Sequence, residues 1–203
     1  AIGSDLNPFA TFLTRLTAIP CDIKALQETF KEIEHDVKDK ICTLYETPCP
    51  NCKNKAQIIS TVWVNSEKPT HVFIECPHCM CGRIHKKDSR QLIRVRREDI
   101  ISVNRADKIA AKELKRFTPP TDKLPYDADV ETVNELFSKR NLYALCLLFD
   151  SISRKAKEKN IRDLLKLTFT ANLEPVSKLV PLRSSRLEKG VVPAGSWYDK
   201  RFR

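Results

Sequence analysis

The sequence predicts an α+β chain that is mainly helical and contains one small β-hairpin. Apolar residues recur at steps of three and four through several long stretches, which is the period of an amphipathic helix. Two Cys-Pro-x-Cys pairs bracket a run rich in β-branched residues, which predicts two paired strands. The chain has 12 prolines but only 4 glycines among 203 residues, and this favours helices joined by stiff connections over a β-rich fold.

The N-terminal part predicts two helices. Asn7 is a good N-cap and Pro8 suits the first helical position, so a first helix should run from Asn7 to about Leu16, before the break at Pro20. Asp22 can cap a second helix of roughly six turns. Its apolar stripe consists of Ile23, Leu26, Phe30, Ile33, Val37, Ile41 and Leu44.

Four cysteines have the spacing of a metal site. Cys49-Pro50-Asn51-Cys52 and Cys76-Pro77-His78-Cys79 can each form a tight knuckle, and the segment between them reads as a hairpin. Four thiolates in a tetrahedron suit Zn²⁺, and such a set leaves no open position for water, so the expected role is structural. Cys81 can replace Cys79, and His85 is a further substitute ligand. The alternative is two pairs of reduced thiols without metal.

Positive charge is concentrated after the second knuckle. The formal net charge is +10 and the pI is near 9.3, which favours a polyanionic partner. The most basic segment contains Arg83, Lys86, Lys87, Arg90, Arg94, Arg96 and Arg97. Interleaved apolar residues suggest a strand there, which could lie along DNA phosphates or be a solvated edge strand protected by charge. A short basic helix is expected from Ile109 to Phe117.

The second half is predicted to be helical after a proline-rich linker at 118–125. We expect helices at 130–136, 141–156 and 161–173, and a basic, irregular tail from Lys178. Arg140 and Asn141 stand at a helix start. They could offer a guanidinium and an amide to guanine and adenine, or Asn141 could cap the helix while Arg140 pairs with a carboxylate.

Ala1-Ile2-Gly3-Ser4-Asp5-Leu6-Asn7-Pro8-Phe9-Ala10 resembles a segment of S-adenosylmethionine-dependent DNA methyltransferases. In that family, it follows the first strand and the glycine-rich loop. The resemblance implies that Asp5 holds the cofactor ribose, with Asn7 beside it, and that residues 1–20 are a strand–helix piece of a Rossmann-like domain. The glycine-rich loop is absent, and so is any D-P-P-Y or N-P-P-Y motif. We therefore identify no catalytic residue and expect no activity from this chain alone.

The second half carries its own resemblance. Phe137-Ser138-Lys139-Arg140-Asn141-Leu142-Tyr143-Ala144-Leu145 is similar to a stretch of adenine-specific DNA methyltransferases, which often have an inserted zinc ribbon ahead of it. Phe169-Thr170-Ala171-Asn172-Leu173, Ser177-Lys178 and Trp197-Tyr198 also have similar-looking counterparts. The resemblance implies adenine N6 as the methyl acceptor, with double-stranded DNA and the remaining catalytic domain as partners.

These patterns predict four consecutive segments and leave several functions open. Residues 1–20 are expected to belong to the cofactor domain, 21–45 to a long helix, 46–117 to the zinc ribbon with its basic strand and helix, and 118–203 to a helical target-recognition region. A stand-alone zinc-ribbon nucleic-acid-binding protein and an RNA methyltransferase remain as alternatives. With no signal peptide and no apolar run long enough to span a bilayer, no membrane partner and a reducing cytoplasm are expected.

Overall fold

The computed structural model describes residues 7–64, 68–79, 93–124, 131–178 and 198–201. The chain divides into two compact units, and each is discontinuous in sequence. The helical unit comprises Ala1–Asp39 with Leu147–Asn172, and the sheet unit comprises Lys40–Cys146 with Leu173–Arg203. The four consecutive segments proposed from the sequence stay a prediction. The two units are defined by contacts between residues, and each unit combines two separate stretches of the chain.

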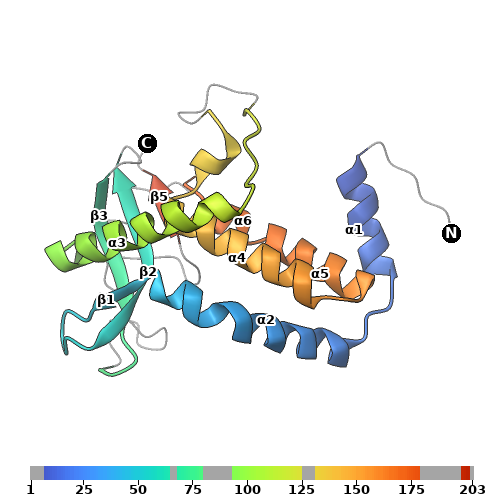
Figure 1. The fold of residues 1–203 in the computed structure, drawn as a ribbon, viewed down its shortest axis with the longest axis horizontal. Coiled ribbons are helices and arrows are strands. Elements are labelled where there is room, and N and C mark those ends of the chain that lie inside the picture. The colour runs from blue at the N-terminus through green and yellow to red at the C-terminus, as the bar shows by residue number, and fades with distance from the viewer. Residues whose placement is uncertain (1–6, 65–67, 80–92, 125–130, 179–197, 202–203) are drawn as a thin grey trace. The chain divides into compact units, whose positions relative to one another are not determined.

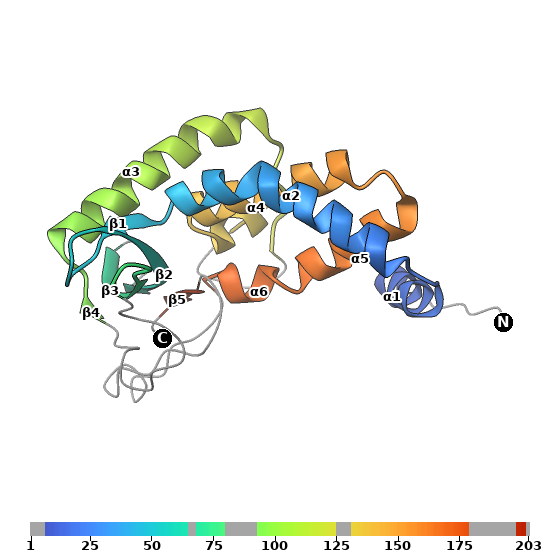
Figure 2. The same ribbon diagram turned by 90° about the horizontal axis from the view of Figure 1, so that it is seen from below.

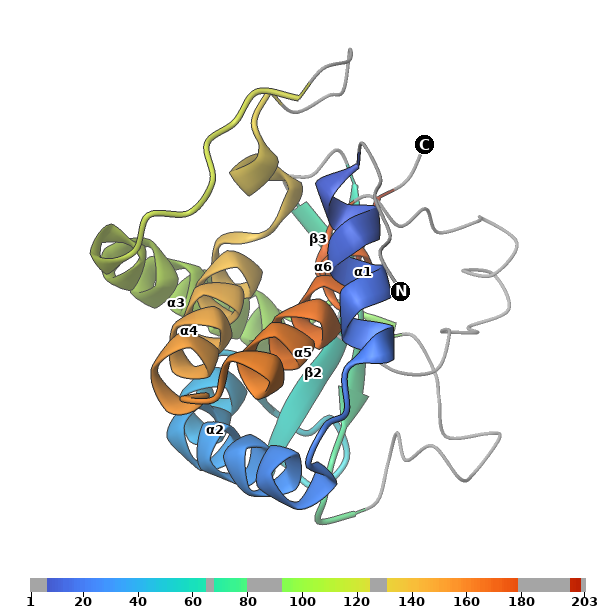
Figure 3. The same ribbon diagram turned by 90° about the vertical axis from the view of Figure 1, so that its right-hand side faces the viewer.

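The helical unit is built from α1 (Pro8–Ala18), α5 (Lys159–Thr170) and parts of α2 (Ile23–Thr43) and α4 (Lys139–Lys155) (Figure 3). Both predicted caps at its N-terminal helices are confirmed. The Asn7 side chain accepts the backbone N–H of Phe9, and the Asp22 side chain accepts those of Lys24 and Ala25. These side chains satisfy N–H groups that have no partner within the first helical turn.

Packing inside the helical unit follows the predicted apolar stripes. Leu16 of α1, Ile33 and Val37 of α2, and Ile161 and Leu165 of α5 are buried. Arg15 forms an ion pair with Asp163, and this joins α1 to α5. The Asp36 carboxylate on α2 accepts hydrogen bonds from Ser151 and Arg154 on α4. Apolar burial therefore holds these helices together, with polar contacts at its edge.

The sheet unit contains one small sheet. Its strands are β1 (Glu46–Pro48), β2 (Lys55–Val64), β3 (Lys68–Glu75), β4 (Ile93–Arg94) and β5 (Tyr198–Arg201). The order β1-β2-β3-β4 is antiparallel throughout, and β5 pairs with β2 in parallel. The predicted hairpin is thus β2 and β3, and the strand expected in the basic segment is β4.

Helix α3 (Arg97–Glu113) runs across the strands on one side of this sheet (Figures 1 and 2). It is followed by η1 (Leu114–Arg116), while η2 (Val133–Leu136) and α6 (Leu173–Val176) are shorter elements. Val103 of α3 joins a buried cluster with Ile58, Val72 and Ile74 of the sheet. The helix expected from Ile109 to Phe117 therefore begins earlier, at Arg97, and its first half packs on the sheet.

The broad fold class is confirmed. The described chain is mostly helical and has a small sheet beside a cluster of cysteines. The strand of the Rossmann-like piece was expected within residues 1–6, which lie outside the described residues. That part of the fold class remains a prediction, although α1 itself is present.

Candidate functional site

The four predicted cysteines lie together. The Sγ atoms of Cys49, Cys52, Cys76 and Cys79 are all within 4.8 Å of one another. Cys49 Sγ is 3.5 Å from Cys79 Sγ, and Cys52 Sγ is 3.6 Å from Cys76 Sγ. A tetrahedron with Zn–S bonds of about 2.3 Å has S···S edges of about 3.8 Å. The donor set and its dimensions therefore fit one zinc ion, and the cluster could hold such a metal.

The first knuckle is shaped by its own backbone. The Cys49 N–H donates to Asn54 O at 2.8 Å, and the Lys53 N–H donates to Cys49 O at 3.1 Å. The backbone N–H of Asn51 lies 3.4 Å from Cys49 Sγ, where it can stabilise a thiolate. This tight turn requires φ 63° at Lys53, a left-handed conformation that costs energy in a residue with a Cβ.

The surroundings of Cys52 oppose ionisation of its thiol in the absence of a metal. A backbone hydrogen bond from Asn54 lowers the pKa of the Cys52 thiol, but desolvation and the thiols of Cys76, Cys79 and Cys49 outweigh it and raise that pKa to about 11. The Cys52 thiol therefore resists ionisation. A bound divalent cation reverses this preference, because it stabilises the thiolates that coordinate it. Cys81 and His85, the alternative ligands, lie outside the described residues.

A buried carboxylate connects the first knuckle to α3. Asp99 is fully buried and accepts hydrogen bonds from Thr47 Oγ1 at 2.6 Å and from Arg96 Nη2 at 2.7 Å. Arg96 also donates to the carbonyl of Pro48, the residue before Cys49. Burial by itself would raise the pKa of Asp99, but hydrogen bonds from Arg96 and Thr47 lower it below its usual value. Thus the knuckle and the start of α3 are held in one arrangement.

Sequence reasoning missed this role of Asp99. Its signal was the position of Asp99 three residues after Arg96, where an acidic N3 side chain accepts the N-cap backbone N–H at 3.0 Å. Arg96, predicted to contact DNA, is instead engaged with Asp99 and Pro48.

The rest of the predicted basic strip is only partly described. Arg94 on β4 and Arg97 at the start of α3 are exposed, as a DNA contact requires. Arg83, Lys86, Lys87 and Arg90 lie outside the described residues. Within the described part of the strip, Arg94 and Arg97 are therefore exposed to solvent. Arg96, between them, is hydrogen-bonded to Asp99 and Pro48.

Arg140 and Asn141 are inside the sheet unit, with 1% and 2% of their surface exposed. The Arg140 guanidinium donates to Thr61 Oγ1 at 2.6 Å and lies 5.0 Å from the centre of the Tyr45 ring. Asn141 accepts the Tyr45 hydroxyl at 2.6 Å and donates to Val176 O at 2.8 Å. These side chains join α4 to β2 and α6 and offer DNA no surface in this arrangement. The base contacts expected of both residues, and the carboxylate partner expected of Arg140 as the alternative, stay predictions.

The residues expected to bind the cofactor are described only in part. Asp5 lies outside the described residues. Asn7 is exposed, and its side-chain oxygen accepts the Phe9 N–H, so its observed role is to cap α1.

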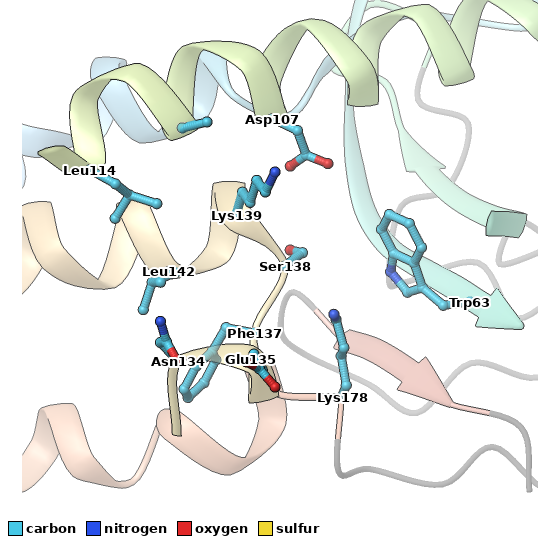
Figure 4. A pocket seen from close by; sticks show the side chains of 11 residues that line it. Trp63, Asp107, Leu114, Asn134, Glu135, Phe137, Ser138, Lys139, Leu142 and Lys178 are labelled. Atoms are coloured by element: carbon cyan, nitrogen blue, oxygen red, sulfur yellow. The ribbon is translucent and has the colours of Figure 1, made fainter. Parts of the chain in front are cut away.

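A pocket of about 630 Å³ lies within the sheet unit at the start of α4 (Figure 4). Asp107 of α3 borders it and accepts the Arg140 backbone N–H at 3.1 Å, which caps α4. Charges of both signs border it, since Asp107 and Glu135 face a pocket that Lys139 and Lys178 also line. Its charge therefore does not select an anion. The remaining lining residues are Trp63, Ala111, Leu114, Asn134, Phe137, Ser138 and Leu142.

Comparisons with protein-family models, with curated proteins and with solved structures find no match to this chain. None of the described helices combines the length and apolar character that a bilayer span requires.

Proposed function

We propose that this chain is the zinc-stabilised, DNA-recognising part of an S-adenosylmethionine-dependent DNA methyltransferase. The observation that carries the proposal is the set of four cysteine sulfur atoms within 4.8 Å of one another. They lie on two knuckles, and the basic strip follows the second knuckle in the sequence. Cys49, Cys52, Cys76 and Cys79 would hold one Zn²⁺. The metal would supply a structural crosslink between the turn before β2 and the end of β3.

The charge of the chain supports DNA as the partner. A net charge of +10 favours a polyanion. The exposed Arg94 lies on β4 of the sheet beside the cysteines, and the exposed Arg97 follows three residues later at the start of α3. Each phosphate contact adds affinity that decreases with salt, so binding should have a steep salt dependence. The target base would have to leave the helical stack to reach a methyl donor.

The enzymatic part of the proposal rests on the short motifs at both ends and in the middle of the chain. Asp5 would hold the cofactor ribose in the complete enzyme, and adenine N6 would accept the methyl group. Several large apolar side chains of the helical unit are exposed, which suits contact with another protein domain. They are Phe9, Leu13, Ile23 and Phe30.

The test combines metal content with two binding measurements. The purified full chain should contain one zinc per molecule and should bind duplex DNA with an affinity that falls steeply between low and moderate salt. Asp5→Ala in the complete enzyme should weaken cofactor binding and leave DNA binding unchanged. A chain without zinc, or DNA binding that does not respond to salt, would contradict the proposal.

A stand-alone zinc-ribbon nucleic-acid-binding protein is the second candidate. It is favoured by Asn7, whose side chain serves as a helix cap and so needs no cofactor to explain it. The two candidates differ in one measurement, because only the methyltransferase requires S-adenosylmethionine to bind the complete gene product.

A further inference from the structure

Helix α3 has a buried face and an exposed face that lie on opposite sides of the helix. The residues buried against the sheet and its neighbours are Asp99, Val103, Ala106 and Ala110. At 100° per residue, the opposite face consists of Arg97, Ile101, Asn104, Arg105, Lys108 and Lys112. All six of these residues are exposed. We call this set the outer face of α3; of its members, only Arg97 belongs to the basic strip predicted from sequence.

The outer face has charges of one sign. It carries four cations and no carboxylate, because the acidic residues of α3 all lie elsewhere on the helix: Glu98, Asp99, Asp107 and Glu113. Among the described residues, no ion pair involves Arg97, Arg105, Lys108 or Lys112, and none of them is neutralised by a neighbour. An ordinary solvated helix mixes the two signs.

Helix α2 provides the comparison within the same chain. Its exposed charged residues include four cations and four carboxylates: Lys24, Lys31, Lys38, Lys40, Glu28, Glu32, Glu34 and Asp39. One of the lysines, Lys38, pairs with Glu34 at 2.7 Å. Solubility alone therefore does not require a helix of this protein to display a single sign of charge. The outer face of α3 needs a different explanation.

We propose that the outer face of α3 enters the major groove of duplex DNA. This inference rests on the proposed DNA-binding function and names the surface that performs it. From Arg97 to Lys112 the helix rises about 22 Å, so its four cations are spread along a length suited to two phosphate backbones. A helix about 10–12 Å in diameter fits a major groove about 12 Å wide.

The residue types at the centre of the outer face select DNA over an acidic protein. Asn104 and Arg105 are adjacent and exposed, and these side chains can form paired hydrogen bonds with adenine and guanine edges. Ile101 lies one turn earlier and is 57% exposed, where it can contact a thymine methyl group. Double-stranded RNA has a major groove too deep and narrow for a helix, so we expect the outer face of α3 to bind duplex RNA more weakly than duplex DNA.

The sheet unit holds this helix in a fixed orientation. The buried Asp99 is bonded to Thr47 on β1 and to Arg96, and Val103 belongs to the same buried cluster as Cys49 and Cys76. Two of the four cysteines are therefore part of the buried core that supports α3. A helix presented on a rigid base loses little conformational entropy when it docks.

The experiment compares two double variants of the full chain that change net charge equally. Arg105→Gln/Lys108→Gln removes two cations from the outer face of α3, and Lys24→Gln/Lys31→Gln removes two exposed cations from α2. Binding to a 25-base-pair duplex is measured by fluorescence anisotropy from low to moderate salt. Zinc content and circular dichroism verify that both variants fold.

The α3 variant should bind about tenfold or more weakly, and the slope of log affinity against log salt should decrease by about 2. The α2 variant should retain nearly all of the affinity and slope of the unmodified chain. If the unmodified chain binds no DNA, the proposed function fails. If it binds DNA and the two variants lose affinity equally, only the assignment to α3 is overturned.

A third arm tests the occupant. Duplex RNA of the same sequence and polyglutamate should both compete poorly against the DNA probe. The opposite result is that either polymer competes as strongly as unlabelled DNA and that this competition is lost in the α3 variant. That result would show that the outer face binds the polymer, and it would overturn the assignment to the DNA major groove.

Discussion

The two compact units of this protein are stabilised in different ways. The sheet unit depends on a few fully buried groups, since Cys49, Cys76 and Asp99 all have 0% of their surface exposed. In the helical unit, Asp36 accepts hydrogen bonds from the fully buried Ser151 and from Arg154, whose side chain is 51% exposed. Large apolar side chains are exposed in both units, such as Phe30 in the helical unit and Ile101 in the sheet unit. Damage to one buried group should therefore affect the sheet unit as a whole, whereas the helical unit should tolerate local changes.

Metal removal is the largest expected perturbation and separates the two units. Stripping the proposed zinc with a chelator would leave four crowded thiols, and the free energy of metal binding would be lost from the folded state. Amides of β2 and β3 should lose most of their protection in hydrogen exchange. Amides of α5 in the helical unit should remain protected.

Cys49→Ser is the genetic version of this experiment, and Cys146→Ser is its matched control. Cys146 is a partly buried cysteine outside the cluster. The control should keep both the metal and the protection of β2. Equal loss of protection in both units after chelation would show that the units do not differ as described.

Replacing Asp99 is the next largest change. Asp99→Asn keeps the size of the side chain but removes the charge that Arg96 and Thr47 stabilise inside the sheet unit. Breaking a buried ion pair costs about 3 kcal/mol of unfolding free energy. The measurement is urea unfolding of the metal-loaded chain at pH 7.

The same variant predicts a pH dependence with a definite sign. The folded pKa of Asp99 is lowered, so its contribution is fully present above its unfolded pKa of about 3.9 and is lost as pH falls through the folded value. The difference between the unmodified chain and Asp99→Asn should be constant above about pH 5 and decrease in more acidic solution. Glu98→Gln removes one negative charge at an exposed neighbour and is the matched control. A constant Asp99 effect down to pH 2 would contradict the depressed pKa.

An ion pair of the helical unit should matter much less. Arg154 bonds Asp36 and Asp150 at 2.7 Å, but its exposure allows solvent and salt to screen both contacts. Arg154→Gln should therefore destabilise the chain by no more than about 1 kcal/mol in low salt, and by less in 1 M NaCl. A loss as large as that of Asp99→Asn would mean that the helical unit also depends on single polar groups.

Local signals in the sequence were sufficient for much of the fold. Asn7 and Asp22 are side chains that cap the helices they precede, so the starts of α1 and α2 could be predicted. The Cys-Pro-x-Cys spacing predicted the cysteine cluster, because each knuckle places two sulfurs together within four residues. The β-branched residues between the knuckles then predicted a hairpin, which places the two ends of the segment, and so the two knuckles, side by side.

Long-range contacts could not be predicted in this way. Arg140 and Asn141 were expected at a helix start, either as side chains that contact bases or as a carboxylate partner and a helix cap, but they bond Thr61 and Tyr45, which are far away in sequence. The first half of α3 was not predicted as a helix, because its burial depends on packing against the sheet through Val103. Only the tertiary arrangement separates the inner face of α3 from its outer face.

The smallest expected effect sharpens the description of the first knuckle. Lys53 has φ 63°, a conformation in which glycine avoids the steric cost that a Cβ imposes. Lys53→Gly should therefore leave the stability of the metal-loaded chain unchanged or raise it by up to about 1 kcal/mol, measured by urea unfolding. Lys55→Gly is the matched control, because this exposed lysine begins the extended strand β2, where glycine should destabilise by about 0.5–1 kcal/mol. If the two variants lose equal stability, the left-handed turn at Lys53 is not a constraint on the knuckle.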